Sequence, residues 1–378
     1  MTGRRFRDLS SGVKVLLGIF TRRWAFTGPR SVGLTIANVC DTACLMCGVH
    51  SPLLKQPPVS DTTPTPAFSR RHPFMEDGLL KWCIQECHEM GTFRLVLGGN
   101  GEPALHPRFD EMLELMKRLN MEPYVLTNGI SLNPTRVKLW ANIPGHFRFS
   151  LHAGDPETWG RVHPGNQPEQ FERLSRHIKE LAAAGVPKVS VMQVIQQANC
   201  RQVRQMVEHA REVGVQEILF RPARSDGGLT QVIPTPGEER ELHRELAQCL
   251  KLANRYGIHT NLAEYLENNL HSHQGVLNTW PLYQKIPCYV GHLHAEIDLD
   301  GTLIPCIFSK RIMGRMGVER LRDMWHSPRY QAYRLEGRAM PRRGTPVKGC
   351  QCGACCMAKF NENLYNLLHL KSLRYGEA

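Results

Sequence analysis

The alternation of short apolar strands with amphipathic helices is the feature of this 378-residue sequence that most constrains its fold. Six strand–helix pairs follow one another between Val32 and Tyr256. Repeated pairs of this kind imply parallel strands joined by helical crossovers. Because the glycine fingerprint of a dinucleotide-binding fold is absent, an open or partial barrel is favoured. The chemistry of such a barrel is expected on the loops at the carboxyl ends of its strands.

The expected elements are these: strands at 32–37, 93–97, 123–126, 147–151, 189–195 and 217–220, and helices at 76–90, 109–119, 134–141, 169–184, 201–213 and 237–256. After about residue 263 the pattern changes to a hairpin at 295–304, a helix at 318–334 and a last helix at 358–370. This part has little apolar core, so a metal centre is expected to stabilise it. We therefore predict a basic N-terminal segment (1–31), a barrel (32–262) and a C-terminal module (263–378).

The thirteen cysteines are distributed unevenly along the chain. Three lie within residues 40–47 and four within residues 350–356. The sequence carries no export signal and no apolar run that could span a membrane, which indicates a cytoplasmic protein. In a reducing compartment, tight cysteine clusters indicate metal or iron–sulfur ligation rather than disulfides. Cys288 and Cys306 stand apart from both clusters, and the remaining four, at 83, 87, 200 and 249, are expected to be buried small hydrophobes.

The first cluster, Cys40-x3-Cys44-x2-Cys47, follows directly after the first expected strand. Three thiolates on one short loop can surround one iron–sulfur cubane and leave one iron open to a small molecule. A zinc site that takes a distant fourth ligand is the alternative.

The spacing of these cysteines resembles the radical S-adenosylmethionine (SAM) superfamily. Three further elements, each at the end of the next strand, fit this resemblance: Gly98-Gly99-Asn100-Gly101-Glu102-Pro103, Thr127-Asn128-Gly129 and Phe149-Ser150-Leu151-His152. The resemblance covers residues 32–222 and implies a partial (β/α)6 TIM-like barrel. It also implies a SAM-ligating 4Fe–4S cluster, reductive cleavage of SAM to a 5′-deoxyadenosyl radical, and abstraction of a substrate hydrogen. The positions it assigns to SAM binding are Gly98, Gly99, Gly101, Glu102, Pro103, Asn128, Ser150 and His152.

A second cysteine pattern, Cys288-x17-Cys306 followed by Cys352-x2-Cys355, has Gly301 five residues before Cys306. It is similar to the shortened SPASM domain called the twitch domain. The resemblance implies one auxiliary 4Fe–4S cluster on these four cysteines, with Cys350 or Cys356 as possible substitutes. A four-cysteine zinc knot is the alternative.

A fully thiolate-ligated auxiliary cluster suits an electron acceptor, which favours net oxidation. The expected reaction is dehydrogenation of a small sugar- or cyclitol-like molecule, supported by a reductant such as flavodoxin or ferredoxin. Peptide or protein maturation is the first alternative, weakened by the short stretch before Cys40, and a non-catalytic electron-transfer protein is the second.

Catalytic residues are not identified, and Arg148, His152, Arg221 and Arg224 are candidates because each is expected at a strand end, facing the cavity. The loop 50–73, rich in proline, is expected to cover part of the site.

The net charge is +12, from 47 Lys and Arg against 35 Asp and Glu. This charge is scattered and not interleaved with aromatics, so a nucleic-acid partner is not expected, whereas an anionic substrate is consistent with it. The N-terminal segment combines arginines with apolar residues and could bind a membrane surface. A helix packed on the barrel is the preferred interpretation.

Overall fold

The computed structural model describes residues 2–54, 72–225, 228–267, 279–355 and 357–369. Its centre is a ten-stranded sheet with the order β10-β9-β8-β1-β2-β3-β4-β5-β6-β7. Strands β1 to β7 and β8 run parallel, and only β9 and β10 are antiparallel to their neighbours. The strands are β1 (Ser31–Thr35), β2 (Arg94–Gly98), β3 (Glu122–Thr127), β4 (His146–Ser150), β5 (Lys188–Ile195), β6 (Glu217–Pro222), β7 (His259–Thr260), β8 (His294–Ile297), β9 (Thr302–Ile304) and β10 (Gly314–Arg315).

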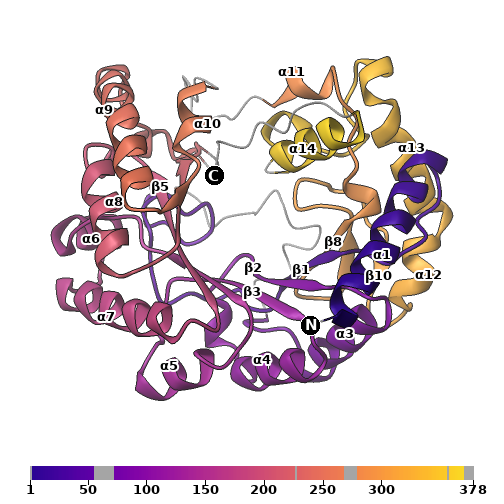
Figure 1. Cartoon of the computed structure of the whole chain (residues 1–378), viewed down its shortest axis with the longest axis horizontal. Helices are drawn as coiled ribbons and strands as arrows, with labels where there is room; N and C mark the ends of the chain where they lie inside the picture. Colours follow the sequence, from indigo (N-terminus) through magenta and orange to yellow (C-terminus); the bar gives the residue numbers. More distant parts are fainter. Residues whose placement is uncertain (1, 55–71, 226–227, 268–278, 356, 370–378) are drawn as a thin grey trace.

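Helices cover the outer face of the strands, as Figure 1 shows for the arc from α3 to α9. The helices are α1 (Thr2–Thr21), α3 (Asp77–Glu89), α4 (Phe109–Arg118), α5 (Pro134–Trp140), α6 (Pro156–Val162), α7 (Pro168–Ala184), α8 (Val203–Glu212), α9 (Pro236–Arg255), α10 (Leu262–Glu267), α11 (Trp280–Tyr283), α12 (Leu321–His326), α13 (Pro328–Arg343) and α14 (Ala358–Leu368). The predicted α/β fold with a mostly parallel sheet is confirmed.

Local sequence signals explain where several helices begin. Helix α9 starts with a capping box, in which Thr235 accepts from the N–H of Glu238 and the Glu238 side chain accepts from the N–H of Thr235. Pro236 occupies the first turn, where its missing N–H costs nothing. Helix α7 ends at Gly185, whose φ of 72° is the left-handed conformation typical of a helix C-terminus.

The C-terminal module differs from the prediction in how it connects to the barrel. The predicted hairpin is present as β8 and β9, but β8 also pairs in parallel with β1 and thereby extends the barrel sheet. The apolar core of the module is continuous with that of the barrel. The single helix expected at 318–334 is two helices, because Ser327 has extended backbone and caps α13.

The N-terminal segment forms α1, and it packs on the C-terminal module rather than on the barrel as expected. A Cβ at Gly18 would lie 3.4 Å from Nδ1 of His292, and Ile19 is buried. The indole N–H of Trp325 donates to the carbonyl of Thr27 just after the helix. None of the helices in the part of the chain that the structure describes is long and apolar enough to cross a lipid bilayer.

Candidate functional site

The loop after β1 places the three cysteines Cys40, Cys44 and Cys47 together, each half-buried. The hydroxyl of Thr42 lies 3.2 Å from Sγ of Cys40 and 3.5 Å from Sγ of Cys44, so one side chain bridges two of the thiols. The N–H groups of residues 49 and 50 donate to Sγ of Cys47 over 3.4 and 3.2 Å. Donors directed at sulfur stabilise a thiolate, which is the form that ligates iron.

Burial raises the pKa of Cys44 to about 12 and raises that of Cys40 as well. A thiolate at either position therefore needs a positive partner to compensate for lost solvation. Iron ions supply that charge. The donor set and its environment fit the cluster that the sequence predicts, and these three side chains would hold it.

The glycine-rich loop after β2 lies directly against the segment that precedes Cys40. The N–H of Gly101 donates to the carbonyl of Ala37 over 3.1 Å, and the N–H of Glu102 donates to that of Val39 over 2.9 Å. A Cβ on Gly101 would be 2.3 Å from the carbonyl oxygen of Val39. Glycine is therefore required at position 101, because two backbone segments approach each other more closely than any side chain permits.

Two residues that the sequence assigned to SAM binding connect this loop to the cysteine loop. The buried carboxylate of Glu102 accepts from the N–H of Asn128 and from the hydroxyl of Thr127, each over 2.7 Å. The side-chain amide of Asn128 donates over 2.6 Å to Asp41 in the cysteine loop. Burial raises the pKa of Glu102 to about 7. The side chains of Glu102 and Asn128 thus position the cysteine loop.

At the end of β4, His152 has a backbone φ of 59°, in the left-handed region. Two hydrogen bonds hold this conformation: Asn199 donates to its carbonyl over 2.8 Å, and the N–H of Val194 donates to Nδ1 over 3.0 Å. Burial holds the pKa of His152 well below its usual range. Because Nδ1 accepts, the neutral ring carries its proton on Nε2, which has no partner among the described residues. Ser150 lies at the last position of β4 and is half-buried.

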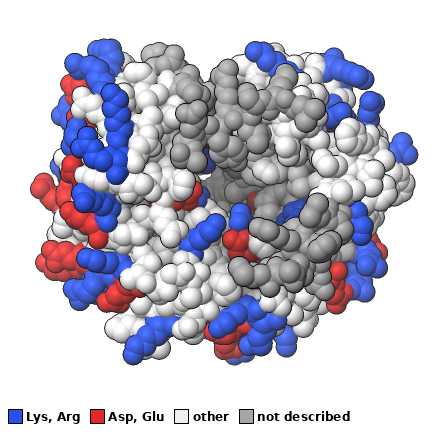
Figure 2. All heavy atoms as spheres, viewed as in Figure 1, with Lys and Arg blue, Asp and Glu red and all other residues white. Residues whose placement is uncertain are grey.

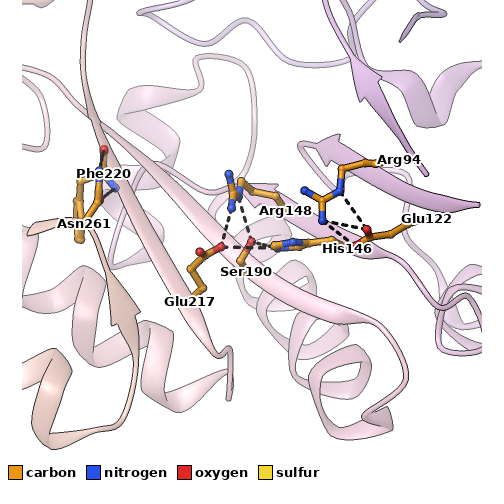
Figure 3. A network of polar contacts seen from close by, with 8 residues as sticks. All are labelled: Arg94, Glu122, His146, Arg148, Ser190, Glu217, Phe220 and Asn261. Carbon is orange, nitrogen blue, oxygen red and sulfur yellow. Dashed lines mark hydrogen bonds and ion pairs between the residues drawn. The ribbon is translucent and has the colours of Figure 1, made fainter. Parts of the chain in front are cut away.

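Arg148 is in the middle of β4, not at a strand end as expected. Its guanidinium donates to Glu217 of β6 over 2.6 Å and to Ser190 of β5 over 3.1 Å (Figure 3). These residues are register neighbours on adjacent strands, and His146 joins the same network through Ser190. The charge of Arg148 is therefore compensated by Glu217, and a role of Arg148 in the site stays a prediction.

Of the other two arginine candidates, Arg221 is the penultimate residue of β6 and Arg224 follows the strand. Arg221 is exposed and forms no ion pair or hydrogen bond with any described residue. Arg224 lies beyond the strand, with its guanidinium 5.1 Å from the ring centre of Phe308 in the C-terminal module. Arg221 is therefore the candidate whose charge remains available to a ligand.

The C-terminal module brings together five thiols, which we call the auxiliary thiol group: Cys288, Cys306, Cys350, Cys352 and Cys355. Burial, and then the negative charge of neighbouring thiols, raises the pKa of Cys288 and Cys306. A hydrogen bond with Cys352 lowers the pKa of Cys350, and Cys350 is also among the groups that influence Cys306 and Cys355. Cys350 is therefore a full member of the group. Cys356 and most of the loop 50–73 lie outside the described residues.

Hydrogen bonds to the auxiliary thiol group come from residues that sequence reasoning missed. The hydroxyl of Tyr283 donates to Sγ of Cys355 over 3.0 Å, and the amide of Asn361 donates to that hydroxyl, also over 3.0 Å. Five clustered thiols with such a donor fit an iron–sulfur cluster. Within the described ranges, no three His, Cys, Asp or Glu side chains lie close enough together to hold a single metal ion. The cysteines at 83, 87, 200 and 249 are buried in the core, as predicted.

A partial barrel with three cysteines after its first strand, joined to a module with five more, defines an iron–sulfur protein of the barrel type. The sequence pattern of the radical SAM superfamily matches residues 34–219, and that of an iron–sulfur cluster-binding (SPASM) domain matches residues 288–364. The chain belongs to the radical SAM superfamily and carries a SPASM domain. Its cofactors are SAM, the SAM-ligating 4Fe–4S cluster and an auxiliary cluster.

Among curated proteins, the chain is 22% identical over 269 residues to the tungsten-containing aldehyde ferredoxin oxidoreductase cofactor-modifying protein of Pyrococcus furiosus, covering 64% of this chain and 69% of that protein. It is 24% identical over 186 residues to a probable GTP 3′,8-cyclase of Saccharolobus islandicus, covering 49% of this chain and 54% of the relative.

Two solved structures share the fold. The SAM-bound structure of SuiB from Streptococcus suis has a TM-score of 0.61 at 15% identity, covering 88% of this chain and 73% of SuiB. Native anSMEcpe with bound AdoMet has a TM-score of 0.58 at 14% identity, covering 90% of this chain and 98% of the other. At these identities the likeness concerns the fold alone.

Proposed function

We propose that this protein is a radical SAM oxidoreductase that dehydrogenates a small anionic molecule of the sugar or cyclitol type. The auxiliary thiol group is the observation that carries this proposal. Five thiols in one group, three of them buried, suffice to fill every protein-ligand position of a 4Fe–4S cluster. A cluster with no open iron is suited to accepting an electron rather than to anchoring a substrate. Net oxidation needs such an acceptor, because removal of a hydrogen atom must be followed by loss of a second electron.

The charge on Arg221 supports an anionic substrate. This side chain is exposed on the last strand before the α9 crossover, and no residue in the described part of the chain forms an ion pair with it. A guanidinium in this position suits a carboxylate or a phosphate. The names of the two curated relatives refer to a cofactor and to GTP, both small molecules. GTP is itself an anion.

With its cluster and SAM bound, the family's chemistry supplies a radical that abstracts hydrogen from the substrate. The chain's own residues hold and orient the reactants. Glu102 and Asn128 fix the cysteine loop, the Nε2–H of His152 offers a hydrogen bond at the end of β4, and Arg221 binds the anionic group. The roles of His152 and Arg221 are proposals that rest on their position and free donors.

Anaerobic incubation with SAM and dithionite tests the proposal. Phosphorylated sugars, cyclitols and a set of peptides are supplied separately, and 5′-deoxyadenosine and product mass are measured. We expect one small anionic substrate to stimulate 5′-deoxyadenosine and to lose two hydrogens. Arg221→Met should raise its KM at least about tenfold. The matched control Arg108→Met, which removes an exposed guanidinium paired with Glu111 at the start of α4, should not.

Stimulation by peptides alone would replace the proposal with peptide maturation. A fully loaded protein that forms no 5′-deoxyadenosine under any condition would instead indicate an electron-transfer protein. Either result overturns the proposed oxidation.

A further inference from the structure

The outward face of α1 and the turn after it carries an apolar surface that no other part of the described chain covers. Val13, Leu17 and Phe20 are 54%, 49% and 65% exposed, and they are spaced at i, i+4 and i+7 on one helical stripe. Trp24 and Phe26, in the turn after the helix, are also exposed, at 47% and 50%. We call these five side chains the N-terminal apolar surface.

The opposite side of the same segment is fixed to the C-terminal module. Ile19 is 1% exposed, and Ala25 is buried as well. Arg334 donates to the carbonyl of Arg23, and Trp325 donates to that of Thr27. Packing on the C-terminal module therefore accounts for one face of the segment, and the same packing holds the other face outward. Figure 1 shows α1 at the outer side of the molecule, across from α7 to α9.

The charged residues of the segment 12–26 are all of one sign. Lys14, Arg22 and Arg23 are exposed beside it, and residues 12–26 contain neither Asp nor Glu. An apolar stripe with Trp and Phe, flanked by cations only, is the pattern of a segment that lies in the headgroup region of a bilayer with anionic lipids. An uncharged apolar partner would leave the cations without a function.

We propose that the N-terminal apolar surface docks this enzyme on an anionic lipid surface. Binding buries the apolar side chains among the upper acyl chains, while Lys14, Arg22 and Arg23 lie at the level of the headgroups. Residues 12–21 are already helical in α1 and packed on the C-terminal module, so docking requires no further folding of this segment. This proposal is independent of the substrate, and its failure leaves the proposed oxidation untouched.

Vesicle flotation of the full-length, cluster-loaded protein tests the proposal. Vesicles of phosphatidylcholine with one quarter phosphatidylserine are compared with vesicles of pure phosphatidylcholine. We expect flotation with the first and at least about tenfold less with the second. The double variant Leu17→Glu with Phe20→Glu should lose flotation. Val186→Glu is the matched control, because Val186 is 52% exposed at the turn between α7 and β5.

Iron content and far-ultraviolet circular dichroism are measured for each variant to check that it is folded. We expect every variant to fold, because the replaced side chains are exposed. The double variant Arg22→Gln with Arg23→Gln should reduce flotation with the vesicles that contain phosphatidylserine. It should leave the weaker flotation with pure phosphatidylcholine unchanged. Absence of flotation for the wild type would overturn the proposal. So would a concentration-dependent dimer that the Leu17→Glu, Phe20→Glu variant abolishes, since a second copy would then cover the surface.

Discussion

Replacement of Gly101 by alanine is the sharpest test of how this fold holds the cysteine loop. The added Cβ would lie 2.3 Å from the carbonyl oxygen and 2.7 Å from the nitrogen of Val39. Both atoms are backbone, so neither can rotate away. The two loops must separate, and the hydrogen bonds from Gly101 to Ala37 and from Glu102 to Val39 then break.

The cost can be estimated from these contacts. Forcing a methyl group into a closely packed position costs about 1–3 kcal/mol. Each of the two lost hydrogen bonds contributes about 1 kcal/mol more. The total of about 3–5 kcal/mol acts on the docking of the cysteine loop. We therefore expect Gly101→Ala to lose most of the iron bound by Cys40, Cys44 and Cys47 and to retain that of the auxiliary cluster.

Gly48→Ala is the matched control, because Gly48 follows Cys47 directly and its Cβ would meet nothing within 4 Å. Iron and sulfide after anaerobic reconstitution, together with SAM affinity from equilibrium dialysis, provide the assay. Gly48→Ala should match the wild type in both measurements. If Gly101→Ala also binds wild-type amounts of iron and SAM, the close approach of the two loops does not position the cysteines and the reasoning is refuted.

Three further predictions concern other parts of the structure. Tyr283→Phe removes the hydroxyl that donates to Cys355 and should shift the reduction potential of the auxiliary cluster to a more negative value, as measured by redox titration followed by electron paramagnetic resonance. Tyr265→Phe, whose buried hydroxyl has no hydrogen-bond partner among the described residues, should not shift it. Burial lowers the pKa of His163 to about 4, so the unfolded state binds more protons than the native state as the pH falls through 6.5. This one residue should lower the free energy of unfolding by about 1.5 kcal/mol between pH 6.5 and 5. If urea unfolding of His163→Gln shows no reduction in this loss, the prediction is contradicted. Glu217→Gln removes the carboxylate that pairs with Arg148 of β4 and should lower the free energy of unfolding in urea by about 1–3 kcal/mol. The iron content should not change. Loss of iron would show instead that this network acts on the cluster site.

The sequence predicts the residues at strand ends well, because apolar periodicity places the strands and the chemistry follows each of them. The three cysteines after β1 and the elements after β2, β3 and β4 all occur where expected. The pairing of side chains across long separations could not be predicted. Asn128 and Asp41 lie 87 residues apart, and only the neighbouring positions of β1, β2 and β3 bring them together.

The same reason explains three features that the sequence could not supply. The pairing of β8 with β1 joins segments at opposite ends of the chain, and no local pattern encodes it. Arg148 has the sequence context of a strand-end residue, but the register of three strands places Glu217 within its reach. Cys350 could not be ranked above its neighbours by spacing, because its membership of the auxiliary thiol group depends on the folded module.

The iron and sulfide content of the anaerobically reconstituted protein tests the central claim most directly, namely that two separate thiol groups hold two clusters. We expect about eight irons per chain in the wild type and about four in a variant with Cys40, Cys44 and Cys47 all replaced by alanine. About four irons falling to none would contradict the account. The auxiliary thiol group would then hold no cluster, and the proposed oxidation would lose its electron acceptor.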